Sequence, residues 1–410
     1  MNAIKSRKWV RILAAILAAG MLAFMAANYV VDPVDYFAAT GDKTTYDPNN
    51  YTRKIKTEYI LKRFPDVEGI LLGGSKAGVL DPKRITSYTG LSYYNLSFTH
   101  GNFSDYETWT KFLVKHLKNL KEITIHLSSI ETGYYSWYRD VTPQAETRVP
   151  ALMTGNLWDG ITETLSYLCT DVKTLFKGWR NPDRGITRDT LATGQKNWRA
   201  AIKAFEIDPE AYLQKNFYAD ENSTLTMLFA NTTDDEKKYY QENLDALIRI
   251  KNVCEKNGIT LKVVIGASNL FERYQYESDQ YLEYLKQIVM ITGGLWDFSS
   301  YSSLNLNPCN FYEKRHYTTQ LGDLEIDIMY GAKDPADYDA FGIWLTPDNV
   351  EAYLNQRRSD WNALKEEFET TGTLVLPGME DDSWIQESDP VDSESAQNIT
   401  SDSSESEANH

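Results

Sequence analysis

The chain of 410 residues is 42% hydrophobic and 13% aromatic, so it can build one large domain or two ordinary ones. Its formal net charge of −16 argues against nucleic acid as a partner, because neutralising phosphate groups requires clustered Lys and Arg. The charge is uneven, since residues 376–410 hold 10 acidic residues and no Lys or Arg. This tail is also almost free of apolar side chains, and we expect it to be disordered.

Cysteine usage excludes a disulfide framework. Cys169, Cys254 and Cys309 lie far apart and lack the short spacings of metal ligands. They allow at most one disulfide. No motif indicates a metal or an organic cofactor, and we expect neither.

The amino-terminal segment has the pattern of a membrane anchor. Basic residues within 1–11 precede residues 12–31, which carry no charge and are long enough to span a bilayer. The basic flank predicts that residues 1–11 are cytoplasmic and that the rest is extracytoplasmic. A cleaved signal peptide is the alternative, although Met25 and Asn28 disturb any Ala-x-Ala cleavage site.

Strand and helix patterns then alternate along the chain. We expect strands at 69–72, 91–98, 122–127, 261–265 and 294–298. We expect helices at 51–63, 105–118, 233–258, 279–288, 319–329 and from Thr346-Pro347 to about 370. This alternation predicts an α/β domain over residues 32–375, with a central parallel sheet between two helical layers.

Residues 131–233 break the alternation. They are rich in Trp and Tyr, with helices expected around 158–177 and 197–205. We interpret this stretch as a mostly helical insertion that caps the sheet, and a separate domain is the alternative.

The first strand runs directly into Gly73-Gly74-Ser75. Glycines permit a tight turn, and ligands of open α/β sheets bind at the carboxyl ends of strands. The turn therefore presents one hydroxyl where chemistry could occur, with Lys76 expected at the cleft rim. An ordinary strand-to-helix loop would look the same. A phosphate-binding loop is disfavoured, because neither GxxxxGK[ST] nor GxGxxG is present in register.

Among the five histidines, His316 is the best candidate for a general base. His116 lies on a basic helix face and is expected to be solvated, and His126 lies inside a strand and is expected to be structural. His316 precedes a helix and follows Glu313 by three residues, so the two can meet over one bend. A nucleophilic serine needs such a base with an orienting carboxylate behind it. A charged surface loop is the alternative, and HExxH, the zinc motif, is absent.

These blocks together resemble the SGNH/GDSL hydrolase superfamily. There the serine lies in a GDS or GSS block near the amino terminus, a glycine loop follows the second strand, and a DxxH block lies near the carboxyl end. The resemblance covers roughly residues 51–331 without the insertion. The anchor followed by Asn28-Tyr-Val-Val-Asp-Pro33 is similar to the membrane-anchored branch, which includes proteins similar to the D-alanyl transfer protein of teichoic acid modification and extracytoplasmic polysaccharide O-acyltransferases.

The resemblance implies a role for each matching residue. Ser75 would be the nucleophile, His316 the general base and then acid, and Glu313 the orienting carboxylate. The amides of Ser75 and Gly101 would donate to the oxyanion, with Asn102 as a further donor. The sequence departs from the family pattern in two places: Glu313 replaces the usual Asp, and Ser128-Ser129 stand where the family has an asparagine after the third strand.

The resemblance implies a membrane-anchored extracytoplasmic serine esterase or O-acyltransferase that acts on cell-envelope polysaccharide. An acyl group on Ser75 could pass to water or to a sugar hydroxyl. The alternative is a non-catalytic cell-envelope scaffold or interaction protein with a degenerate hydrolase fold. A separation above about 7 Å between Ser75 Oγ and His316 would favour the scaffold, because even one water could not bridge it. The acyl group, the acceptor, the oligomeric state and any integral membrane protein that supplies the acyl donor are left open.

Overall fold

In a computed structural model of the protein, the described residues are 3–33, 36–37, 52–98, 101–128, 149–180, 191–196, 198–213, 215, 237–270, 279–313 and 315–371. The predicted disorder of residues 376–410 lies outside this part of the chain.

Six strands form the central sheet in the order β2-β1-β3-β4-β5-β8. Their bounds are β1 Gly69–Gly73, β2 Tyr93–Ser97, β3 Glu122–Leu127, β4 Thr260–Ile265, β5 Leu295–Asp297 and β8 Ile343–Leu345. The first five strands run parallel, which confirms the predicted α/β architecture. The edge strand β8 was not predicted and pairs antiparallel with β5.

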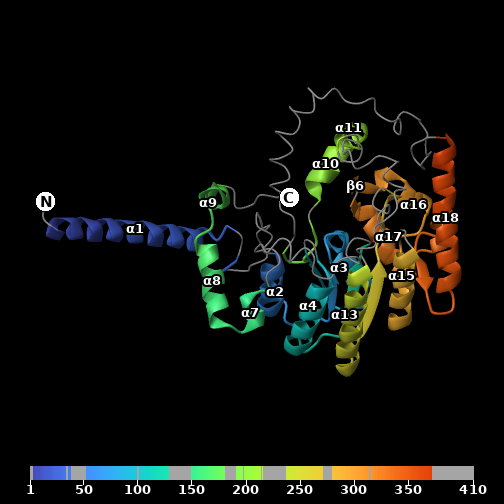
Figure 1. Cartoon of the computed structure of the whole chain (residues 1–410), viewed down its shortest axis with the longest axis horizontal. Coiled ribbons are helices and arrows are strands. Elements are labelled where there is room, and N and C mark those ends of the chain that lie inside the picture. The colour runs from blue at the N-terminus through green and yellow to red at the C-terminus, as the bar shows by residue number, and fades with distance from the viewer. Residues whose placement is uncertain are drawn as a thin grey trace.

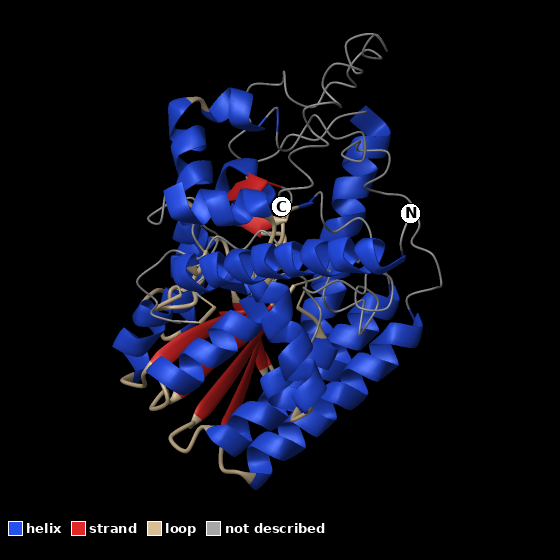
Figure 2. Ribbon diagram, turned by 90° about the vertical axis from the view of Figure 1, so that its left-hand side faces the viewer, coloured by secondary structure: helices blue, strands red, loops and turns tan. Residues whose placement is uncertain are grey.

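Helices cover both faces of the sheet (Figure 2). Those of the α/β core are α2 Thr52–Arg63, α3 Pro82–Thr89, α4 Phe103–His116, α13 Lys237–Lys256, α15 Asp279–Thr292, α17 Thr319–Met329 and α18 Val350–Thr371. Short elements between β5 and α17 are α16 Ser303–Leu306 and the strands β6 Phe311–Glu313 and β7 His316–Tyr317. A 3₁₀ turn, η1 (Ala77–Val79), links β1 to α3.

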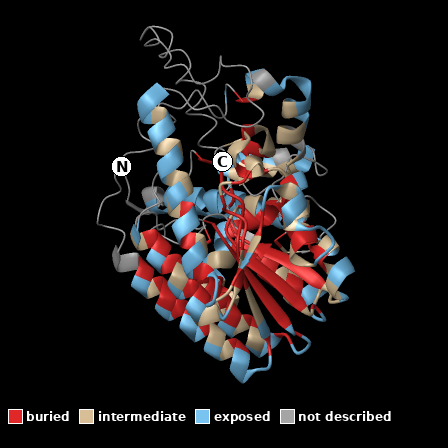
Figure 3. Ribbon diagram, turned by 90° about the vertical axis from the view of Figure 1, so that its right-hand side faces the viewer, coloured by how far each residue is buried: buried red, intermediate tan, exposed pale blue. Residues whose placement is uncertain are grey.

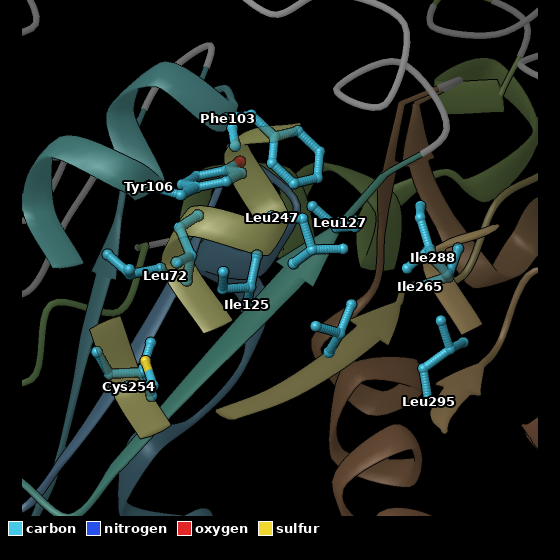
Figure 4. Packing of buried hydrophobic residues seen from close by; sticks show 14 of the residues in the cluster. Leu72, Phe103, Tyr106, Ile125, Leu127, Leu247, Cys254, Ile265, Ile288 and Leu295 are labelled. Atoms are coloured by element: carbon cyan, nitrogen blue, oxygen red, sulfur yellow. The ribbon is translucent and has the colours of Figure 1, made fainter. Parts of the chain in front are cut away.

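The residues of β1 show how the sheet divides the core. Ile70 and Leu72 pack with α4, α13 and α15, whereas Leu71 between them packs with α3 and α17. Successive residues of a strand point to opposite faces, so a strand buried on both faces needs an unbroken apolar run. Figure 3 shows the sheet buried beneath its helices, and Figure 4 shows Leu72, Ile125 and other side chains of the first face in contact.

The last helix begins later than the sequence pattern suggests. We expected Thr346-Pro347 to start it, but α18 begins at Val350. The Thr346 amide donates to Asn349 Oδ1 over 2.7 Å, and Asn349 Nδ2 donates to the Trp344 carbonyl over 2.9 Å. These bonds close a turn after β8, so the helix starts only after this turn.

The long apolar helix α1 (Ala3–Val31) projects from the domain (Figure 1). Its segment Arg7–Val31 is long and apolar enough to cross a membrane, and a stretch of 18 residues within it has a mean hydropathy of 2.2. At its carboxyl end, α1 contacts α8 (Leu157–Leu168) and α9 (Val172–Arg180), which belong to the insertion. The short helix α7 (Ala151–Thr154) precedes them.

The rest of the described insertion runs along the edge of the sheet to the site. The amide of Asn95 in β2 donates to the Thr193 carbonyl over 2.9 Å, and the Lys196 amide donates to the Gly78 carbonyl over 2.8 Å. Helices α10 (Arg199–Ile207) and α11 (Pro209–Leu213) follow. This part of the insertion therefore contacts the β2 edge and the turn that follows β1.

Candidate active site

Ser75 lies just after β1, at the point where the order of the sheet reverses. The chain passes from β1 to β2 on one side and then to β3 on the other, and ligands of doubly wound sheets bind outside the carboxyl ends of the strands at such a point. Gly73 makes the turn possible, because a Cβ at this position would lie 2.4 Å from Ala77 Cβ and 2.6 Å from the His126 carbonyl oxygen. Ser75 itself is half-buried.

Glu313 and His316 come from the β6–β7 hairpin, in which the two residues are paired. The hairpin leads directly into α17, whose first turn is capped by the Thr318 hydroxyl accepting from the Leu321 amide over 3.3 Å. The hairpin and the helix start fix the backbone of His316 on both sides.

The structure brings Ser75, His316 and Glu313 together. His316 Nε2 lies 2.7 Å from Ser75 Oγ, and His316 Nδ1 hydrogen-bonds Glu313 Oε1. The second carboxylate oxygen of Glu313 accepts the Arg315 amide over 2.9 Å. Since an ionised carboxylate only accepts, Nδ1 carries the proton and Nε2 is free to accept the serine proton. This is the arrangement in which imidazole acts as a base towards a hydroxyl.

Electrostatics keep this histidine neutral and this carboxylate ionised. Burial lowers the pKa of His316, and the positive charges of Lys196 and Lys76 lower it further. The Glu313 carboxylate raises this pKa but does not compensate fully, so the pKa of His316 lies below its usual 6.5. Burial raises the pKa of Glu313, but the charge and hydrogen bond of His316, the Arg315 amide and Lys196 together lower it to about 2. At neutral pH the pair is therefore imidazole and carboxylate, as a general base requires.

Gly101 and Asn102 lie beside the Ser75 turn. A Cβ on Gly101 would lie 2.8 Å from the Gly73 carbonyl oxygen and 3.1 Å from Gly74 Cα, so only glycine permits this approach. Asn102 Oδ1 caps α4 by accepting the amides of Ser104 (3.1 Å) and Asp105 (3.2 Å). Because the oxygen is used in the cap, the NH₂ group is the half of this side chain that could donate to a ligand.

Two residues at the site were not predicted, and both come from the insertion. The Trp198 ring lies 5.0 Å from the His316 ring and stacks on Tyr312 at 4.9 Å, while Lys196 Nζ lies 4.4 Å above the Trp198 ring. The buried Trp198 Nε1 has no hydrogen-bond partner among the residues that the structure describes. The only signal in the sequence was the general abundance of aromatic residues in this stretch, which does not single out Trp198.

The interpretation of Lys76 as a residue of the cleft rim is wrong. Its side chain is buried, and Nζ donates to the Ala267 carbonyl over 3.2 Å. Its role is to tie the Ser75 turn to the loop after β4, with its charge held near His316.

A buried polar network lies next to the hairpin. Oε1 of Glu325 in α17 accepts the Ala267 amide over 2.7 Å. Oε2 of Glu325 accepts the Tyr317 hydroxyl over 3.1 Å and lies 3.2 Å from His126 Nε2. His126, Tyr317 and Glu325 are all fully buried. The network joins β3, the loop after β4, β7 and α17, and gives His126 the structural role expected for it. Of the two serines that follow β3, Ser128 is buried and Ser129 lies outside the described part of the chain.

The described side chains do not form a metal centre. Within the part of the chain that the structure describes, no group of three or more His, Cys, Asp or Glu could hold a metal ion. The three cysteines are free thiols, and burial raises the pKa of Cys254 to about 11.

In comparisons with known proteins, no family model matches the chain, and no curated protein sequence matches it.

Proposed function

We propose that the protein is a serine esterase or O-acyltransferase in which Ser75 forms an acyl-enzyme. The observation that carries the proposal is the chain of hydrogen bonds from Ser75 Oγ through His316 to Glu313, with 2.7 Å between the hydroxyl and Nε2. This distance is well below the separation of about 7 Å at which a scaffold would be favoured.

Each group has a defined part in the proposed reaction. Ser75 Oγ attacks the carbonyl carbon of an ester while His316 Nε2 takes the hydroxyl proton. The amides of Ser75 and Gly101 and the NH₂ of Asn102 donate to the developing oxyanion. His316 then returns the proton to the leaving alkoxide, and Glu313 stabilises the imidazolium that exists between the two transfers.

The second half of the reaction decides between the two activities. Water attacking the acyl-enzyme gives an esterase, and a sugar hydroxyl gives a transferase. The proposed substrate is acylated cell-envelope polysaccharide, supported by the apolar helix α1, which would hold the site beside the membrane on its outer side. The Trp198 ring, whose centroid lies 5.0 Å from that of His316, adds an aromatic group beside the proposed base, and aromatic rings are common partners of sugars.

Labelling with a fluorophosphonate tests the proposal directly. The full-length protein in detergent should label stoichiometrically and hydrolyse a simple acetyl ester, and Ser75→Ala should abolish both. Ser87→Ala, which removes an exposed hydroxyl on α3, is the matched control and should behave as wild type. Equal labelling of Ser75→Ala and wild type would exclude this function and leave the scaffold. Faster deacylation in the presence of an oligosaccharide acceptor would assign the transferase.

A further inference from the structure

Helices α8 and α9 follow each other along the chain, and we call the pair the α8–α9 hairpin. Each helix carries a row of exposed apolar side chains, and together these rows are the apolar stripe. On α8 these are Trp158, Ile161 and Leu165, and on α9 they are Val172, Phe176 and Trp179. The spacings of three and four residues place each set on one face of its helix. The two tryptophans and Val172 are 71%, 66% and 69% exposed, which is not expected of a face that meets water.

The opposite face of α8 attaches the hairpin to the domain. Glu163 forms an ion pair with Lys54 of α2 over 2.9 Å and accepts the Ala151 amide over 2.8 Å. Tyr167 is buried and stacks on Tyr36, with ring centroids 3.4 Å apart. The apolar stripe is thus held outward by a polar and aromatic face that points inward.

The end of α1 is built into the same structure. Asn28 is fully buried and its Nδ2 donates to the Leu168 carbonyl over 3.0 Å. A Cβ on Gly178 of α9 would lie 2.5 Å from Pro33 Cβ, so α9 packs closely on the chain that leaves α1. Figure 1 shows α8 running across the end of α1 with α9 beside it. These contacts favour an α1 that is retained rather than cleaved, because removal of α1 would remove the side-chain amide of Asn28 that donates to the Leu168 carbonyl.

We propose that the α8–α9 hairpin is a membrane-interface element, whose stripe inserts into the outer surface of the bilayer that α1 spans. The orientation supports lipid as the occupant: a helix that crosses the end of a membrane-spanning helix lies along the bilayer surface. The end of α1 also exposes apolar side chains, Tyr29 and Val30. Tryptophan is enriched at this depth of the membrane.

The charges beside the stripe fit lipid headgroups. Lys173 and Arg180 of α9 are exposed and lie on the flank of its apolar face. Amphipathic helices that lie in the interface have this composition, with basic residues towards the headgroups and Trp, Phe and Leu towards the acyl chains. The hairpin would then act with α1 as a second point of attachment, fixing the domain in one orientation. Attachment of this kind does not depend on the chemistry proposed for Ser75.

Site-directed spin labelling measures the depth of each position. Single cysteines at Ile161 and Phe176 are introduced into full-length protein whose Cys169, Cys254 and Cys309 are replaced by Ser or Ala, and labelled with a nitroxide. The control is Ser166→Cys, at an exposed polar position of the same helix. The proteins are reconstituted in vesicles of three parts phosphatidylethanolamine to one part phosphatidylglycerol.

For each label we take the ratio of its accessibility to oxygen to its accessibility to a polar nickel reagent. This ratio should be at least about threefold higher at positions 161 and 176 than at position 166. An equal ratio of oxygen to nickel accessibility at all three positions in lipid vesicles would overturn the proposal. Protection that develops only in native membranes, and not in lipid vesicles, would assign the stripe to a membrane-protein partner and equally overturn it. Circular dichroism of each labelled protein verifies the fold.

Discussion

Glu313 and His316 stand opposite each other across the β6–β7 hairpin, so the carboxylate that orients the imidazole is held by the same short ladder as the imidazole itself. Pairing across this hairpin brings the Glu313 carboxylate to His316 Nδ1. The acid and the base of the proposed site therefore belong to one structural element.

Glu313→Gln should separate orientation from charge. The amide NH₂ can donate to Nδ1, which favours the tautomer with the proton on Nε2, and that tautomer cannot accept from Ser75. We expect the fluorophosphonate labelling rate to fall on the order of 10³- to 10⁴-fold. Glu313→Asp keeps the negative charge, so its labelling rate should fall far less. If Glu313→Gln labels at the wild-type rate, Glu313 is not the orienting acid.

The pH dependence should follow the lowered pKa of His316. The free base is the active form, so the rate should remain high below pH 6.5 and fall only as the pH drops through the lowered pKa. Lys196→Met removes a positive charge that disfavours imidazolium, so the acid limb of ester hydrolysis should move to higher pH. Lys203→Met, at an exposed position of α10, is the control and should leave the profile in place. A shift to lower pH in Lys196→Met would contradict the electrostatic account.

Asn102→Ser tests whether Asn102 is an oxyanion donor as well as a helix cap. Serine is also a good N-cap, so the melting temperature should change little. Its shorter side chain cannot place a donor where the NH₂ lies, and the turnover number should fall by about 10²- to 10³-fold. Unchanged turnover would limit Asn102 to capping. A large fall in melting temperature would show that the cap itself had been lost.

Tyr317→Phe probes the buried network next to His316. The change leaves a Glu325 oxygen short of one hydrogen bond in a fully buried site, which should lower the free energy of unfolding by about 1–3 kcal/mol. Tyr88→Phe is the matched control. It removes a hydroxyl that donates to Asp327 over 2.7 Å, but the ring is 39% exposed and water can replace it. Urea unfolding measures the free energy of unfolding of both variants. An equal decrease in the two variants would show that the burial of Tyr317 adds nothing to the effect.

The parts of the fold that could be predicted are those with a strong local pattern. The apolar run of β3 and the periodicity of α17 are such cases, and the predicted bounds 122–127 and 319–329 agree with the structure. The strands β6, β7 and β8 have only two or three residues each. Segments of that length carry no periodicity, and their pairing depends on contacts with distant parts of the chain.

The residues of the candidate site also differ in whether a local sequence pattern could predict them. Ser75, Glu313 and His316 could be proposed because each lies in a short block with a recognisable chemical order. Trp198 could not, because it reaches the site through pairing between residues 193 and 95, which no local pattern predicts. Lys76 was misplaced for a related reason, since its burial depends on the loop after β4.

Ser75 and His316 hydrogen-bond although 241 residues separate them in the chain. At a synthesis rate of about 5–20 residues per second, the serine leaves the ribosome roughly 12 to 48 s before the histidine. During that interval the hydroxyl is an ordinary alcohol without a base. In the proposed mechanism Ser75 becomes reactive only when the β6–β7 hairpin has docked, and a chain cut short before residue 316 would carry a serine without its proposed base.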